Sequence, residues 1–248
     1  MDVLGVGVHA IDMPAAVAEI GRWIEEGERR YVCVTGVHGV MESRRDEELR
    51  RIHNESGLTT PDGMPMVWAC RYANMAGTQR VYGPDLLLKM CARGIDLGWS
   101  HYFYGGKEGV PELLAERLVA RFPGLRIAGG YSPPFRPLTA TEEVDVAARI
   151  NATSPDIVWV GLSTPKQERW MAGQRDLLKA GALVGVGAAF DIHAGLVQQA
   201  PHWMQVSGLE WLFRMGKEPR RLARRYLRNN PAFVAAILKS PPRARTKF

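Results

Sequence analysis

The stretch Ile157–Trp170, IVWVGLSTPKQERW, decides the fold class. Its first six residues are apolar, mostly β-branched and interrupted by one glycine, which is typical of a strand covered by helices on both faces. Ser163, Thr164 and Pro165 then favour a helix start, because proline is tolerated at the first helical position and a hydroxyl oxygen can accept a backbone N–H there. Thr164 and Gln167 also fit a capping box. The stretch therefore predicts a central strand that turns directly into a helix.

The turn from Gly161 to Gln167 is a candidate anion site. Backbone N–H groups and the positive end of the helix dipole meet there, which suits a diphosphate. The structural alternative is a plain strand-turn-helix unit, in which a capping box explains Thr164 and Gln167 without any ligand. The local chemistry alone leaves both interpretations open.

Strand and helix patterns alternate on both sides of this stretch, and they set the fold class. Short apolar runs predict strands at Val3–Val8, Tyr31–Thr35, Leu58–Thr60, His101–Tyr104, Arg126–Ala128 and Ala182–Phe190. Helical spacing predicts helices at Met13–Ile24, Val40–Ile52, Pro65–Ala73, Pro84–Ala92, Pro111–Arg121 and Glu142–Ala152. We therefore expect a Rossmann-like α/β fold, with a mostly parallel sheet, helices on both faces and ligands at the strands' carboxyl ends.

Other predicted strands end in residues that suit a ligand. Gly105 and Gly106 begin the loop GGKEGVPE, where glycines let the backbone approach a phosphate or nucleotide. Asp62 lies between Pro61 and Gly63 at a strand's end, although aspartate there is most often only a turn residue. Asp191 closes the last predicted strand and could hold a uridine or ribose, or simply cap the next turn.

Charge separates the chain into two predicted parts. Residues 201–248 hold eleven Lys and Arg against two Glu, a net charge of +9, whereas the remainder carries 21 against 24, a net charge of −3. Apolar residues are interleaved with the tail arginines, as in a helix lying on an anionic bilayer. We expect an α/β core at 1–200 and a basic amphipathic helical appendage at 201–248, with a disordered end from Pro241 to Phe248.

Composition narrows the class of protein further. The three cysteines form neither a disulfide set nor a metal cluster, which favours a reducing cytoplasm. No signal peptide or membrane-spanning run is evident. The chain lacks an Asp-x-Asp pair and its histidines lack metal-ligand spacing, so we expect a reaction without a metal. A dehydrogenase is disfavoured because Phe190 takes the third glycine's place in the Gly185-Val186-Gly187 fingerprint. A nucleotide-dependent oxidoreductase and a nucleic-acid-binding protein remain the alternatives.

Five motifs carry a family resemblance. They are TPDGMPMVW (60–68), GLSTPKQERWM (161–171), GAAFDIHAG (187–195), APHWM (200–204) and GLEWLFRMGKEPRRLARRYL (208–227). Together they closely resemble the WecG/TagA/CpsF family of bacterial glycosyltransferases, in order and over nearly the whole chain. The resemblance implies an inverting transfer of an N-acetylmannosamine-type or related hexose from a UDP-sugar to a polyprenyl-diphosphate-linked saccharide, in cell-surface polysaccharide synthesis.

The resemblance also assigns roles to individual residues. It makes Asp62 the general base, and it places Thr35, Arg80 and Gln167 in the pocket, where Arg80 offsets charge on the departing UDP and Gln167 bonds sugar or phosphate. It implies no cofactor and no metal. Many relatives have a Thr-x-Asn pattern where this chain has Thr35-Gly36-Val37-His38. The asparagine's contact is therefore lost or made by His38, which leaves the sugar open.

The resemblance gives the basic tail a role as well. It matches Arg214, Arg221 and Arg224 to phosphate contacts, and it implies a peripheral cytoplasmic enzyme on the inner face of the cell membrane. An anionic membrane surface and the lipid-linked acceptor are then the expected partners, and nucleic acid is not. The donor sugar, the acceptor saccharide, the pathway and the oligomeric state, a homo-oligomer included, are not identified by the sequence.

Overall fold

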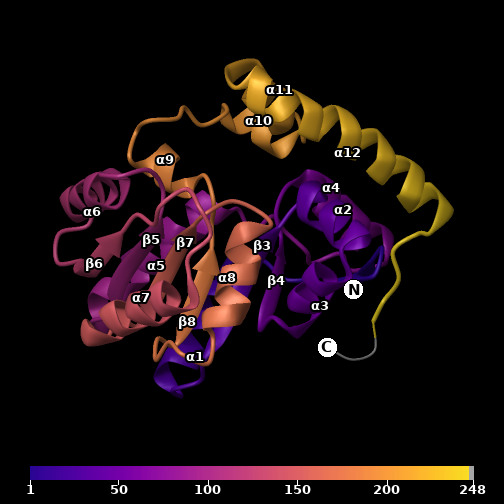
Figure 1. Ribbon diagram of the computed structural model, residues 1–248. Helices are drawn as coiled ribbons and strands as arrows, with labels where there is room; N and C mark the ends of the chain where they lie inside the picture. The colour runs from indigo at the N-terminus through magenta and orange to yellow at the C-terminus, as the bar shows by residue number, and fades with distance from the viewer. Residues whose placement is uncertain (246–248) are drawn as a thin grey trace. The chain divides into compact units, whose positions relative to one another are not determined.

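The computed structural model describes residues 1–245 and shows an α/β fold (Figure 1). Within these residues, six strands form one parallel sheet in the order β4-β3-β8-β7-β5-β6. The strand β7 lies between β8 and β5, so the central strand predicted from IVWVG is confirmed. The strands are β3 (Arg30–Thr35), β4 (Leu58–Pro61), β5 (Ser100–Gly105), β6 (Arg126–Tyr131), β7 (Ile157–Gly161) and β8 (Ala182–Gly185).

The chain divides into two compact units, each made of separate segments. Unit 1 comprises Met1–Ala16, Val34–Tyr82 and Gln198–Phe248, whereas unit 2 comprises Val17–Cys33 and Gly83–Val197. The strand β3 belongs to both, since its first four residues fall in unit 2 and its last two in unit 1. The C-terminal segment therefore groups with the residues around β4.

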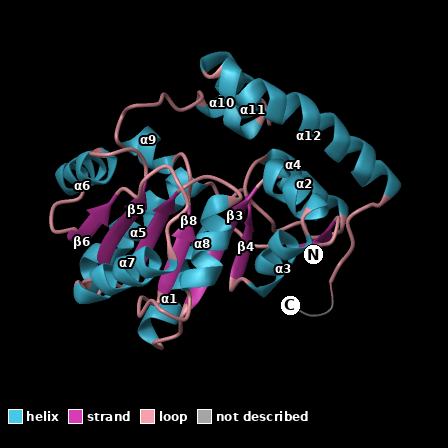
Figure 2. Cartoon of the chain, in the orientation of Figure 1, coloured by secondary structure: helices cyan, strands magenta, loops and turns pink. Residues whose placement is uncertain are grey.

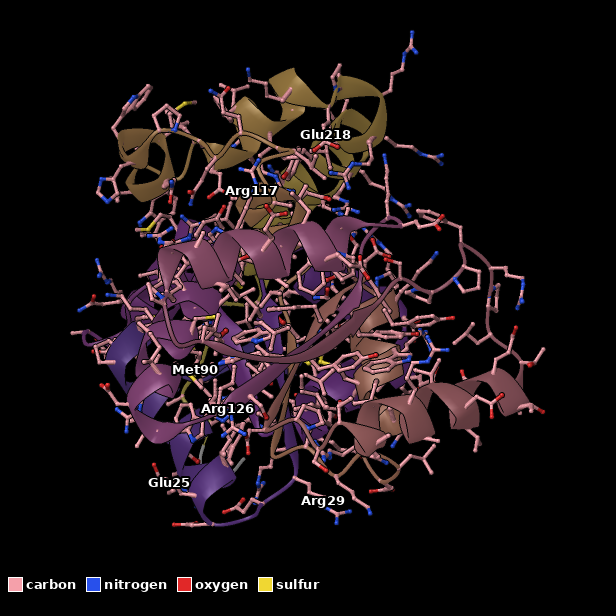
Figure 3. The ribbon with its side chains drawn as sticks, turned by 90° about the vertical axis from the view of Figure 1, so that its left-hand side faces the viewer. Glu25, Arg29, Met90, Arg117, Arg126 and Glu218 are labelled. Atoms are coloured by element: carbon pink, nitrogen blue, oxygen red, sulfur yellow. The ribbon has the colours of Figure 1, made fainter. Side chains whose placement is uncertain are left out.

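Unit 2 holds most of the sheet. The helices α7 and α8 cover one face and α5 covers the other, as right-handed crossovers between parallel strands require (Figure 2). Trp159 on β7 and Met90 on α5 are fully buried. Figure 3 labels Met90. The helices are α1 (Met13–Glu25, which begins in unit 1), α5 (Gly83–Leu97), α6 (Val110–Arg121), α7 (Ala140–Ala152), α8 (Lys166–Gln174) and α9 (Ala189–His193).

Unit 1 is built around β4 and a small apolar cluster. The cluster joins the N-terminal residues to helices α2 and α4 and receives Phe233 from α12. Its buried members are Met1, Val3, Val6, Val8, Val40, Met41, Met66, Ala69, Cys70 and Phe233. The elements of this unit, besides β4, are β1 (Asp2–Val3), β2 (Val6–Gly7), α2 (Val37–Arg45), α3 (Glu47–Glu55), α4 (Met64–Tyr72), α10 (His202–Val206), α11 (Glu210–Lys217) and α12 (Pro219–Lys239).

Two elements of unit 1 differ from the sequence prediction. The run Val3–Val8 is not one strand but the antiparallel pair β1 and β2, because Gly5 turns the chain at a positive φ of 90°. The predicted helix Val40–Ile52 is two helices that meet at Asp46. Asp46 has extended φ and ψ, and its side chain accepts the Leu49 N–H at 3.0 Å, so one residue ends α2 and caps α3.

Two strands of unit 2 also differ from the prediction. The strand β6 runs to Tyr131, beyond the predicted end at Ala128 and through a pair of glycines. Conversely, β8 ends at Gly185 and the helix α9 follows, so Ala182–Phe190 is not one strand. Asp191 therefore lies within α9 and not at the end of a strand.

The C-terminal segment is packed against unit 1. Leu222, Phe233 and Ala236 on α12 are buried. Beyond α12, the backbone of Arg243 pairs with that of Asp2, which differs from the disorder expected from Pro241 onward. The rest of that prediction, at 246–248, lies outside the described residues.

Candidate active site

Asp62 closes β4 at the carboxyl edge of the sheet. The strand is buried along its whole length, and Gly63 turns the chain into α4 at a φ of 85°, a conformation that favours glycine. The backbone holds the turn from two sides, because the Asp62 N–H donates to the Thr35 carbonyl at 2.9 Å and the Val81 N–H donates to the Pro61 carbonyl at 2.9 Å. The ends of β3 and β4 and the segment carrying Arg80 are thereby fixed together.

Arg80 is surrounded by groups that suit a cation. Its guanidinium carbon lies 3.8 Å from the centre of the Tyr82 ring, and its Nη2 lies 3.6 Å from the Asp62 carboxylate. The same nitrogen forms a short ion pair with Glu210 on α11, and Nη1 donates to the Gln205 amide oxygen at 3.4 Å. Burial alone would lower the pKa of Arg80, but the two carboxylates outweigh it and raise the pKa.

The Asp62 carboxyl is poised for proton transfer near neutral pH. Burial raises its pKa from 3.8 to about 6, Arg80 opposes the rise, and Glu210 adds to it. Its Oδ1 is buried without a hydrogen-bond donor among residues 1–245, although the side chain as a whole is 31% exposed. A carboxylate with this pKa is mostly ionised at pH 7 and still basic enough to take a proton from a hydroxyl.

The predicted tail arginines lie in different surroundings. Burial lowers the pKa of Arg214 on α11, but Tyr226 and Tyr82 raise it, and the nearby carboxylates of Glu210 and Asp62 add to the rise. Arg221 instead pairs with Glu218, at 2.6 Å from its Nε, and Figure 3 labels Glu218 where α12 begins. Arg224 is exposed. Of the three, the structure brings only Arg214 to the Asp62–Arg80 pair.

Thr35 and His38 lie near the start of α2 in the same unit. Thr35 is buried, and its carbonyl is the acceptor for the Asp62 N–H. The His38 ring contacts α12, because its Nδ1 lies 3.0 Å from the Asn229 side-chain nitrogen. The same ring nitrogen is 3.7 Å from Glu42. His38 therefore has a structural role in holding α12 to α2, whatever it contacts in a ligand.

The predicted glycines of unit 2 meet at the carboxyl ends of β5 and β7. Gly105 and Gly161 are partners in register, and the Gly106 N–H donates to the Gly161 carbonyl at 3.1 Å. A Cβ on Gly105 would lie 2.7 Å from the Gly161 backbone, and one on Gly161 would lie 2.7 Å from the Phe190 ring. Close packing alone therefore requires glycine at these two positions.

The start of α8 differs from the predicted capping box. The helix begins at Lys166, and the Gln167 N–H donates to the Ser163 carbonyl at 3.0 Å instead of to the Thr164 hydroxyl. The Thr164 hydroxyl donates to the Glu168 carboxylate at 2.8 Å. The capping-box prediction is therefore wrong, and Gln167 is 3% exposed at the start of this helix.

Several residues beside Arg80 or on the inner face of α12 were not found from the sequence. No sequence motif relates Arg80 to Glu210, Gln205 or Tyr82. Glu210 and Gln205 are 130 and 125 residues from Arg80 in the chain. Arg225 and Tyr226 could have been found, because they follow the buried Leu222 by three and four residues and so share its face of the helix. Burial lowers the pKa of Arg225 and raises that of Tyr226.

Residues 1–245 hold neither a metal-binding cluster nor a membrane-spanning helix. No three His, Cys, Asp or Glu side chains in this part of the chain are grouped so that they could hold a metal ion. None of the helices described is both long and apolar enough to cross a membrane.

Comparison with known proteins identifies the family. Residues 1–247 match the model of the glycosyl transferase WecG/TagA/CpsF family. An N-acetylglucosaminyldiphosphoundecaprenol N-acetyl-beta-D-mannosaminyltransferase of Bacillus spizizenii (strain ATCC 23059 / NRRL B-14472 / W23) is 27% identical over 88% of this chain and 82% of its own length. A protein of the same name from Bacillus subtilis (strain 168) is 27% identical over 82% of this chain and 77% of its own. The chain belongs to the WecG/TagA/CpsF family of glycosyltransferases.

Proposed function

We propose that this chain transfers an N-acetylmannosamine-type hexose from a UDP-sugar to a polyprenyl-diphosphate-linked saccharide that ends in N-acetylglucosamine. The names of the two Bacillus relatives support the acceptor and the transferred sugar. The observation that carries the chemistry is the Asp62–Arg80 pair, a partly buried carboxylate with a pKa of about 6 beside an arginine whose side chain is 14% exposed.

In the proposed reaction the acceptor hydroxyl attacks C1 of the sugar. Asp62 takes the hydroxyl proton as the new C–O bond forms, while the bond from C1 to the diphosphate breaks and UDP leaves with the electron pair. The configuration at C1 is inverted because attack comes from the face opposite the leaving group. Arg80 and Arg214 offset the charge on the departing diphosphate, which removes the need for a metal ion.

The basic C-terminal segment supports a location at a membrane. It holds most of the excess positive charge, and Leu227, Val234 and Leu238 on α12 are exposed. Cations interleaved with exposed apolar side chains suit an anionic lipid surface, where a lipid-linked acceptor would be found. We therefore propose a peripheral enzyme of the cytoplasmic membrane face.

The test is a transfer assay with UDP-N-acetylmannosamine and a polyprenyl-diphosphate-N-acetylglucosamine acceptor. Asp62→Asn keeps the shape of the side chain and removes its basicity, so turnover should fall by about 10²-fold or more. Asp96→Asn, which alters an exposed carboxylate on α5, is the matched control and should retain turnover.

The outcome separates this function from the alternatives. Wild-type turnover by Asp62→Asn would exclude Asp62 as the base. A melting temperature raised by NAD(P)H or by an oligonucleotide, and unchanged by UDP, would favour an oxidoreductase or a nucleic-acid-binding protein instead.

A further inference from the structure

A buried carboxylate lies beside Gln167 at the start of α8. Glu168 has no exposed surface and Gln167 is 3% exposed. One Glu168 oxygen, Oε1, accepts the Thr164 hydroxyl at 2.8 Å and the Gln167 side-chain NH2 at 3.1 Å. The other, Oε2, is buried without a donor among residues 1–245. Burying a carboxylate is costly unless its hydrogen bonds compensate, so this arrangement requires a reason.

Helix capping does not supply that reason. Glu168 is the third residue of α8, where a glutamate commonly accepts the backbone N–H of the N-cap residue. Here the N-cap is Pro165, which has no N–H to donate. The Glu168 carboxylate is therefore available for side chains, and it bonds those of Thr164 and Gln167.

The carboxylate fixes which way the Gln167 amide points. Only the NH2 group can donate to Glu168, so the amide oxygen Oε1 must face away from it. That oxygen is buried and has no donor within the described part of the chain. Gly185 of β8 packs tightly against the NH2 side of this amide, since a Cβ there would lie 3.0 Å from Nε2. Gly187 leaves room beside the oxygen, since a Cβ there would be in ordinary contact with Oε1, at 3.5 Å.

We propose that Glu168 is a positioning residue that presents the Gln167 carbonyl to the transferred sugar. A carbonyl oxygen accepts hydrogen bonds and repels phosphate oxygens, so its ligand is a sugar hydroxyl or acetamido N–H and not the diphosphate. The inference rests on the proposed function. It narrows the earlier expectation that Gln167 bonds either sugar or phosphate.

The experiment measures two dissociation constants by calorimetry, one for UDP and one for UDP-N-acetylmannosamine. The Kd for UDP divided by the Kd for UDP-N-acetylmannosamine gives the sugar's contribution to binding. Gln167→Met removes the acceptor and should lower this ratio about threefold to tenfold. Glu168→Met leaves the amide without orientation and should lower it about twofold to fivefold. In the double variant the loss should not exceed that of Gln167→Met alone, because the two side chains act as one unit.

Two further variants separate positioning from stability. Thr164→Val removes a hydrogen bond to the same Glu168 oxygen but leaves the Gln167 bond, so it should lower the melting temperature and keep the ratio. Exchanging the two side chains, as Gln167→Glu with Glu168→Gln, keeps an oxygen towards the sugar, because the new amide at 168 donates to the new carboxylate. The exchanged protein should keep the ratio within about twofold of wild type, since the hydrogen bond to the sugar is retained.

The outcomes distinguish this inference from the proposed function. A wild-type protein that binds neither ligand contradicts the proposed donor and the inference with it. Normal binding by wild type, with ratios unchanged in Gln167→Met or Glu168→Met, overturns only the inference. A low ratio in the folded exchanged protein, or additive losses in the double variant, also overturns it.

Discussion

Asp62→Asn should make the protein more stable at neutral pH while it removes activity. The folded-state pKa of Asp62 is about 6 against 3.8 in the unfolded chain, so the folded protein binds this proton more tightly. The stabilisation that the protonated form provides is therefore present below pH 3.8 and is lost as the pH rises through about 6. An asparagine at position 62 is neutral at every pH, so the variant does not lose this stabilisation as the pH rises.

The size of the effect follows from the two pKa values. Wild type should lose about 0.5 kcal/mol of folding free energy by about pH 4 and about 3 kcal/mol by about pH 7.5, since one pKa unit corresponds to about 1.4 kcal/mol. These are upper values, because solvent reaches part of a side chain that is 31% exposed. The gain of Asp62→Asn over wild type should thus grow by at most about 2.5 kcal/mol between these pH values.

Urea unfolding of both proteins at several pH values, followed by circular dichroism, measures this difference. Asp96→Asn, at an exposed position on α5, serves as the control and should give nearly the same difference from wild type at every pH. A difference between Asp62→Asn and wild type that stays constant from about pH 4 to about pH 7.5 would refute the raised pKa and with it the electrostatic basis of the proposed base.

Four other measurements test the site and the tail. Glu210→Gln should lower the pKa of Asp62, because Glu210 raises it, so the acid limb of the activity profile should move to lower pH; an unmoved limb would contradict the contact. Chelation by EDTA should leave transfer unchanged, and activity that is lost and then restored by Mn²⁺ would require a metal. Phe233→Ala should destabilise unit 1 by about 3 to 5 kcal/mol, whereas Leu238→Ala, at a side chain 78% exposed, should change stability by less than about 0.5 kcal/mol. Binding to anionic vesicles should weaken steeply as salt rises, and salt-independent binding would exclude docking through the basic tail.

The sequence predicted those parts of the fold whose causes are local. An apolar, β-branched run sufficed for β7, and the alternation of such runs with helical patterns sufficed for the parallel sheet. The break at Asp46 was missed because no proline or glycine marks it; the aspartate ends one helix by adopting an extended backbone and caps the next. Likewise, the capping box at Thr164 looked correct in sequence, yet its glutamine and threonine side chains both turn to Glu168.

The sequence predicted only part of the candidate site, because the other part depends on contacts between residues far apart in the chain. Asp62 and Arg80 came from motif resemblance, and both lie on segments that β4 fixes. Glu210 was missed because its pairing with Arg80 depends on how α11 packs in unit 1. The net charge of residues 201–248 predicted a separate appendage. The buried Leu222 and Phe233 show instead that the inner face of α12 is part of the core. Truncation before Gly208 would therefore disturb unit 1 itself, and point substitutions test the tail more cleanly.

The segmented make-up of the two units has a consequence for synthesis on the ribosome. Every residue of unit 2 has been translated once Val197 is added, whereas unit 1 still lacks its last segment at that point. The cluster around Val40, Met41 and Met66 then lacks Phe233, which is translated only after all of unit 2. The nascent chain therefore carries an unfinished apolar surface until Phe233 has been added, and holdase chaperones would bind to that surface. A premature stop codon in the part of α12 before Phe233 would leave that surface permanently uncovered and direct the product to proteolysis.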